Sequence, residues 1–93
     1  MSRLVIIHRP LAGSAWLAPL AASDTTILLR EDAVLLLRRP DFRNAIGGMR
    51  LLALEPDLRA RGVDETRSGE AEAVDHAGFV RACVAHDEVV NWT

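Results

Sequence analysis

The single cysteine of this 93-residue chain, Cys83, is its one candidate sulfur nucleophile. A reactive thiolate needs a helix N-terminus or a neighbouring cation that lowers the thiol pKa. Cys83 instead shares an apolar helical stripe with Phe79 and Val80, so we expect a buried structural cysteine. A metal site with His76 and His86 is the alternative, because a seven-residue step returns to nearly the same helix face. The spacing matches no known zinc pattern, so we expect neither a metal nor another cofactor.

His8 is the best candidate for a polar site. It ends an apolar run and is expected at the same sheet edge as two acidic pairs, Glu31 with Asp32 and Glu55 with Asp57. Sites in parallel sheets form at this edge, where the strands have their carboxyl ends. A histidine there can act as a general base. With no nucleophile predicted beside it, we favour a packing and capping role for His8.

Two common classes of enzyme site are excluded by the positions of glycine and serine. Gly47 and Gly48 precede an expected strand, whereas a phosphate-binding or dinucleotide-binding glycine loop follows one. Neither Ser14 nor Ser68 has the flanking glycines of a nucleophile elbow. We therefore expect no nucleotide, no serine hydrolase chemistry and no small-molecule ligand.

The charge of the chain is unevenly distributed. Residues 1–54 carry seven arginines against four acidic residues, a net charge of +3, and residues 55–93 carry four against nine, a net charge of −5. This polarity favours a protein partner with complementary patches over nonspecific nucleic-acid binding, which needs a basic domain. One basic cluster could contact tRNA phosphates or an acidic protein face, and we interpret it as a solvated loop. Its members are Arg38, Arg39, Arg43 and Arg50. We do not expect direct tRNA contact.

Alternating strand and helix patterns must position these residues. Apolar runs predict strands at residues 4–7, 26–30, 51–54, 73–75 and 89–92, separated by helices at 15–22, 32–37, 55–62 and 76–86. Continuous apolar runs are typical of strands buried on both faces of a parallel sheet. The order predicts one α/β domain over residues 1–93, a small doubly wound and mainly parallel sheet of about five strands flanked by helices.

The connecting segments carry further expectations. Residues 38–50 contain Pro40 and two glycines, so we expect loop or frayed helix with Phe42 and Ile46 turned inward. Residues 63–72 are polar and should form an exposed loop. In the last helix, the spacing predicts one buried face formed by Phe79, Val80, Cys83 and Val84.

Compartment and surroundings follow from composition. One cysteine forms no internal disulfide, so we expect a reducing cytoplasm. The longest uncharged stretch, residues 10–23, is interrupted by Gly13 and Pro19 and is too short to span a membrane. Neither a membrane location nor a signal peptide is indicated. Trp92, beside the end of the chain, should pack on its own domain or in a neighbouring subunit.

The order and spacing of several short motifs resemble the DsrH/TusB family, the smallest branch of the DsrE-like sulfur-relay proteins. The resemblance covers essentially the whole chain, and its most specific piece is Asp-Leu-x-Ala-Arg-Gly. The motifs are His8-Arg9, residues 28–34, residues 53–62, residues 75–81, His86 and Trp92. One departure is Ala33, where relatives often have glycine.

The resemblance implies a DsrE-like, flavodoxin-like fold and membership of a hetero-oligomer. In that family, TusB assembles with the related subunits TusC and TusD. The complex passes persulfide sulfur from TusA towards TusE for 2-thiolation of the wobble uridine of certain tRNAs. In sulfur oxidisers the DsrEFH complex has the corresponding architecture. The sulfur-carrying cysteine that matters most belongs to the TusD or DsrE subunit.

The position of the only cysteine decides how much of this chemistry the resemblance implies here. DsrH proteins can carry a cysteine in the first helical region, but this chain has none before Cys83. We therefore expect a noncatalytic subunit that is not an enzyme by itself and that binds TusC-like and TusD-like chains. The expected partner-binding residues are Asp32, Asp57, Arg59, Arg61 and Trp92.

Three other functions stay open at this point. The chain could be a sulfur carrier that uses Cys83, a DsrH-type subunit in dissimilatory sulfur oxidation, or a stand-alone tRNA-binding module that uses the arginine cluster. Each requires a different partner or a different modification of the chain.

Overall fold

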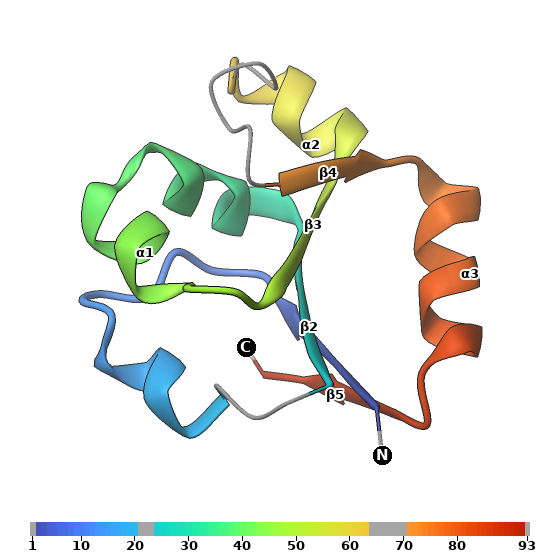
Figure 1. The fold of residues 1–93 in the computed structure, drawn as a ribbon. Helices are drawn as coiled ribbons and strands as arrows, with labels where there is room; N and C mark the ends of the chain where they lie inside the picture. Colours follow the sequence, from blue (N-terminus) through green and yellow to red (C-terminus); the bar gives the residue numbers. More distant parts are fainter. Residues whose placement is uncertain (1, 21–23, 64–70, 93) are drawn as a thin grey trace.

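The fold is a single parallel sheet between two unequal layers of helices (Figure 1). The computed structural model describes residues 2–20, 24–63 and 71–92. Its strands are β1 (Arg3–Ile7), β2 (Thr25–Leu29), β3 (Arg50–Leu54), β4 (Ala71–Val74) and β5 (Glu88–Asn91). They lie in the order β4-β3-β2-β1-β5, and every described pair is parallel. The predicted fold class is confirmed.

The strand order explains why the two layers differ. From β1 the chain moves in one direction through β2 and β3 to β4, and then returns to the far side of β1. This strand order differs from the flavodoxin order, 2-1-3-4-5. There the direction along the sheet reverses after the second strand, whereas here it reverses after β4. Because parallel crossovers are right-handed, a reversal of direction moves the connecting helix to the other face of the sheet.

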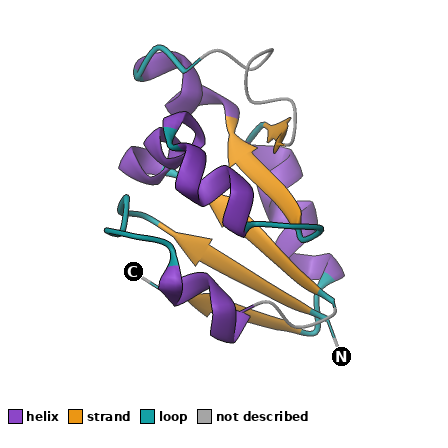
Figure 2. Cartoon of the chain, turned by 60° about the vertical axis from the view of Figure 1, so that its left-hand side comes forward, coloured by secondary structure: helices purple, strands orange, loops and turns teal. Residues whose placement is uncertain are grey.

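The first three connections therefore share one face, and the last connection has the other (Figures 1 and 2). The shared face carries the 3₁₀ helices η1 (Ala15–Leu20) and η2 (Glu31–Arg38), and the α-helices α1 (Pro40–Ala45) and α2 (Glu55–Ala60). Among the described residues, the opposite face carries only α3 (His76–Ala85). With this arrangement all the crossover connections can be right-handed, and no connection requires a knot.

Two hydrophobic cores of unequal size hold these layers. The larger core, on the shared face, includes Val5, Ile27, Phe42 and Leu58, all almost completely buried. The smaller one, here called the α3-side core, consists of Leu4, Ile6, Leu28 and Leu52, with Val74, Phe79, Ala82 and Cys83 packed against it. Strands β1, β2 and β3 contribute to both cores, as their continuous apolar sequences predict.

The segment at residues 38–50, expected as loop or frayed helix, contains the short helix α1. Pro40 occupies the start of this helix, where its fixed φ is favourable and its missing N–H costs nothing. Phe42 and Ile46 point inward as predicted and are at most 2% exposed. The Phe42 ring stacks on Trp16 of η1, with 6.0 Å between ring centroids. In a helix, residues four positions apart lie on the same face. The helical conformation therefore directs both apolar side chains into the core.

The predicted buried face of α3 is wrong in part. Val80 and Val84 are 60% and 80% exposed, and no residue of α3 is fully buried. Phe79, Ala82 and Cys83, at the spacing i, i+3 and i+4, face the sheet instead. The Phe79 ring lies 5.2 Å from the Arg30 guanidinium, an additional cation–π contact that the valines cannot make.

The remaining boundaries differ from the predictions by only a few residues. The expected helix at 32–37 is the 3₁₀ helix Glu31–Arg38, and the expected strand at 73–75 is Ala71–Val74. The expected loop at 63–72 and the end of the helix at 15–22 lie largely outside the described residues. The terminal strand, predicted at 89–92, is confirmed as β5.

Candidate functional site

The carboxyl ends of the parallel strands gather polar residues at one edge of the sheet. His8 follows β1, Glu31 opens η2 just after β2, Asp57 lies in α2 just after β3, and Asn91 ends β5. The chain leaves β1 towards β2, while β5 lies on the other side of β1. Ligands of open α/β sheets bind outside the carboxyl ends of the strands. This edge is therefore the candidate site.

His8 lies between side chains from two other elements. Its Nδ1 is 3.9 Å from Oε2 of Glu31, and its Nε2 is 3.4 Å from Oδ1 of Asn91. Both neighbouring atoms are oxygens, so each ring nitrogen faces a hydrogen-bond acceptor. His8 thus lies at the same sheet edge as the acidic residues after β2 and β3, as predicted. No described nucleophile lies in hydrogen-bond contact with this imidazole.

Asp57 and Arg61 connect α2 to η2. One carboxylate oxygen of Asp57, Oδ2, accepts the backbone N–H of Glu31 at 2.8 Å. The Arg61 side chain donates through Nε to Oδ1 of Asp32 at 2.8 Å, and its Nη1 lies 3.5 Å from Oδ1 of Asp57. The hydrogen bond to Asp32 is the main reason why the pKa of Arg61 is raised above its ordinary value. Three of the five expected partner-binding residues thus form one hydrogen-bonded cluster.

The other two expected residues lie apart from this cluster. Arg59 is exposed and forms an ion pair with Glu55 one turn earlier in α2. Trp92 follows β5, three strand positions from β3, which is about 14 Å at the usual strand spacing. Its backbone N–H donates to the carbonyl oxygen of Ile6 at 2.9 Å, while its side chain is 41% exposed.

The possible metal ligands of α3 do not converge. His76 is the first residue of the helix and His86 follows its last, so they are separated by its whole length, about 15 Å. The His86 ring contacts the carbonyl oxygen of Ala82 through Nδ1 (2.7 Å) and Oγ1 of Thr26 through Nε2 (3.0 Å). Cys83 packs against the α3-side core and is partly, not completely, buried, so it is more exposed than predicted. Within residues 2–20, 24–63 and 71–92, no three His, Cys, Asp or Glu side chains form a group suited to a metal.

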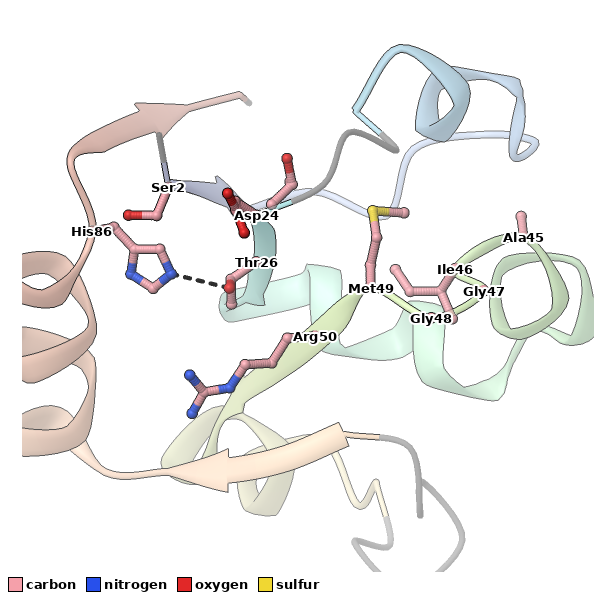
Figure 3. Close-up of a pocket in the computed structure, with 11 residues that line it drawn as sticks. Ser2, Asp24, Thr26, Ala45, Ile46, Gly47, Gly48, Met49, Arg50 and His86 are labelled. Carbon is pink, nitrogen blue, oxygen red and sulfur yellow. Dashed lines mark hydrogen bonds between the residues drawn. The ribbon is translucent and has the colours of Figure 1, made fainter.

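An open cavity of about 580 Å³ lies at the opposite, amino edge of the sheet (Figure 3). Polar groups and the Gly47-Gly48 loop line it, and the close-up shows the His86 ring bonded to Thr26 beside Arg50. The guanidinium of Arg50 is paired with Glu72 at 3.1 Å. Sequence reasoning missed this cavity, because its walls come from segments far apart in the chain and contain no recognisable motif.

Comparison with known proteins gives one family match. The chain matches a protein-family model described as DsrH like protein over residues 12–89. No curated protein matches it. Among the described residues, no helix is both long and apolar enough to cross a membrane. The matched range includes every described helix and the cluster of Asp32, Asp57 and Arg61, but not His8, Asn91 or Trp92.

Proposed function

Since this chain belongs to the DsrH family of sulfur-relay proteins, we propose that it is a noncatalytic subunit of a TusBCD-type or DsrEFH-type sulfurtransferase complex. TusC-like and TusD-like chains are its direct partners. TusA and TusE meet it only through the assembled complex, in the cytoplasm. The sulfur travels as a persulfide on a cysteine of the TusD-like chain and is destined for the wobble uridine of tRNA.

The placement of Cys83 carries the noncatalytic part of this proposal. Its thiol is on the side of α3 that packs against Leu4, Ile6, Leu28 and Leu52. It lies in the eighth position of a ten-residue helix, far from the helix N-terminus that would favour a thiolate. The side chain is partly buried there, and a persulfide would add a second sulfur atom at a packed contact, where extra volume destabilises the fold.

The carboxyl edge supports the partner-binding part. Asp57 and Arg61, only 21% and 27% exposed, hold η2 and α2 together. The more exposed Asp32, together with Arg59 and Trp92, presents charge and an aromatic ring to a neighbouring subunit. Tryptophan and arginine are the residues that most often carry binding energy in interfaces.

Copurification with the two homologous chains tests this function. The unmodified protein and the Cys83→Ser variant should both assemble with TusC-like and TusD-like chains from the same source. After incubation with a persulfide donor, mass spectrometry should find one added sulfur on the TusD-like chain and none on Cys83. A stable persulfide on Cys83 would instead make this chain a sulfur carrier.

The fate of the sulfur is a separate measurement. Loss of the gene should reduce 2-thiouridine at the tRNA wobble position, as measured by nucleoside mass spectrometry. Unchanged thiolation, together with impaired oxidation of reduced sulfur, would assign the complex to dissimilatory sulfur metabolism.

A further inference from the structure

The outward side of α3 is apolar although nothing described covers it. Ala77, Val80, Val84 and Ala85 are all exposed there, and Val84 reaches 80% exposure. The inward side is also apolar, through Phe79, Ala82 and Cys83. His76 and Arg81 are the polar residues of α3, and a helix that is otherwise apolar all round is normally covered on more than one side. The sheet covers one side of α3, so a second surface is needed for the other.

The sheet beside α3 is open as well. Val89 of β5 is in register with Leu4 of β1, and side chains in register on parallel strands point to the same face. Leu4 belongs to the α3-side core, so Val89 points to the face of α3, yet it is 42% exposed. We call Val80, Val84 and Val89 the α3–β5 face.

Acidic residues flank this face at both ends of the helix. Asp75 caps the start of α3 by accepting the N–H of Gly78 at 2.7 Å, and Asp87 follows the end of α3. The charged residue between them is Arg81. Two copies of this chain joined through the same face would place these carboxylates close together, because a two-fold interface pairs a surface with itself. Such pairing of like charges is unfavourable.

We infer that the α3–β5 face docks a different polypeptide, one that presents an apolar helix with basic side chains towards its ends. The small side chains of Ala77, Val80 and Val84 allow the backbone of such a helix to approach closely. Basic groups would lie opposite Asp75 and Asp87. This inference rests on the proposed function, and its partner is one of the two homologous chains of the complex.

A charged double substitution tests the face. Val80→Arg with Val84→Arg should weaken binding to the TusC-like and TusD-like chains by about tenfold or more, because it places two cations in an apolar contact. The matched control is Asn44→Arg with Ala45→Arg, which adds the same charge on α1, on the other face of the sheet. The control should bind like the unmodified protein. Circular dichroism and thermal unfolding should show all three forms folded.

The flanking charge has its own test. Asp75→Asn removes a carboxylate while keeping a good helix cap. It should reduce affinity by roughly threefold at low salt and much less at high salt, since salt screens exposed charges. Equal loss of affinity at both salt concentrations, or no loss at either, would show that the partner has no basic side chain opposite Asp75.

The possible failures are distinguishable. If the unmodified protein binds neither homologous chain, the proposed function fails and the partner assignment fails with it. If it binds but the Val80→Arg/Val84→Arg variant binds equally well, only the α3–β5 face is overturned. A concentration-dependent homodimer that this variant abolishes would show that a second copy covers the face.

Discussion

Glu31 adopts a backbone conformation that side chains with a Cβ rarely tolerate. Its φ is +53°, in the left-handed region, which costs an ordinary residue about 1–2 kcal/mol. Asp57 accepts its N–H, and its own carboxylate lies beside His8. The strain is thus located where β2 ends and η2 begins, in the centre of the candidate site. Strained residues of this kind concentrate at functional positions.

Substitutions at residue 31 can measure this strain. Glu31→Gly should leave the free energy of unfolding unchanged or raise it by up to about 1 kcal/mol, because relief of the strain outweighs the greater chain entropy of glycine. Glu31→Val should lower it by more than about 1 kcal/mol, since a β-branched residue fits this φ poorly. Urea unfolding of both variants gives the values. A glycine variant less stable than the valine variant would contradict the assigned backbone conformation.

Asp87 links the two ends of the chain. Its Oδ2 accepts the backbone N–H of Ser2 at 3.0 Å, and its own N–H donates to Oγ of Ser2 at 3.0 Å. The hydrogen bond from the Ser2 amide is the main reason why the pKa of Asp87 is lowered from its ordinary value of 3.8. A carboxylate with a lowered pKa stabilises the folded state above the ordinary pKa, and this contribution is lost as the pH falls through the lowered value.

Asp87→Asn should therefore flatten the acid side of the stability profile. The variant should be less stable than the unmodified protein at pH 6, and the two should converge as the pH falls below the ordinary carboxylate range. Thermal unfolding between pH 6 and pH 2 measures the difference. A constant gap over this whole range would mean that Asp87 titrates as in the unfolded chain.

Among the elements, α1 is a short helix with a large share in the core. Its six residues include Phe42, which is completely buried and stacks on Trp16. Isolated helices of this length are unstable in water, so tertiary packing must hold α1 in place. Phe42 supplies that packing, and Ile46 extends it beyond the last turn.

Removal of the Phe42 ring should have a large effect. Phe42→Ala should lower the free energy of unfolding by about 3–5 kcal/mol, through lost burial and the cavity left behind. Arg43→Ala, at the exposed neighbouring position, should change it by less than about 0.5 kcal/mol. Urea unfolding followed by circular dichroism measures both. Comparable losses in the two variants would show that helix formation, and not burial, stabilises α1.

At the scale of the whole molecule, the two faces of the sheet are protected unequally. Within the described ranges, η1, η2, α1 and α2 cover one face, and α3 covers the other (Figure 2). No residue of α3 is fully buried, whereas every residue of β2 is. Regions with few buried apolar contacts open at lower free energy than the rest of a domain. The free protein is therefore expected to be least stable at the side assigned to its partner.

Hydrogen exchange can display this asymmetry. Amides of α3 should exchange faster than those of β1 and β2 in the isolated protein, because α3 can open without unfolding the larger core. In the assembled complex, exchange in α3 should slow while exchange in α1 stays the same. Mass spectrometry of peptic fragments resolves the three regions. Equal protection of α3 before and after assembly would place the interface elsewhere.

The parts of this fold that depend on local patterns were predictable from the residues alone. Uninterrupted apolar runs such as residues 51–54 mark strands buried on both faces, and strand and helix alternation implies a parallel sheet. The family also follows from short motifs spread along the chain, and the family match over residues 12–89 confirms it. The position of His8 at the same edge as Glu31 also follows, because parallel strands place their carboxyl ends at one edge.

The tertiary structure decided which of several equally plausible helix faces is buried and which charged residues pair. Apart from His76 and Arg81, α3 is apolar all round, so its sequence does not distinguish a face that includes Val80 and Val84 from one that includes Ala82. The contact of Phe79 with the sheet and with Arg30 selected the second. Arg61 likewise pairs with Asp32, 29 residues away, while Arg59 pairs within its own helix. Long-range contacts of this kind exist only once the strand order has brought η2 beside α2.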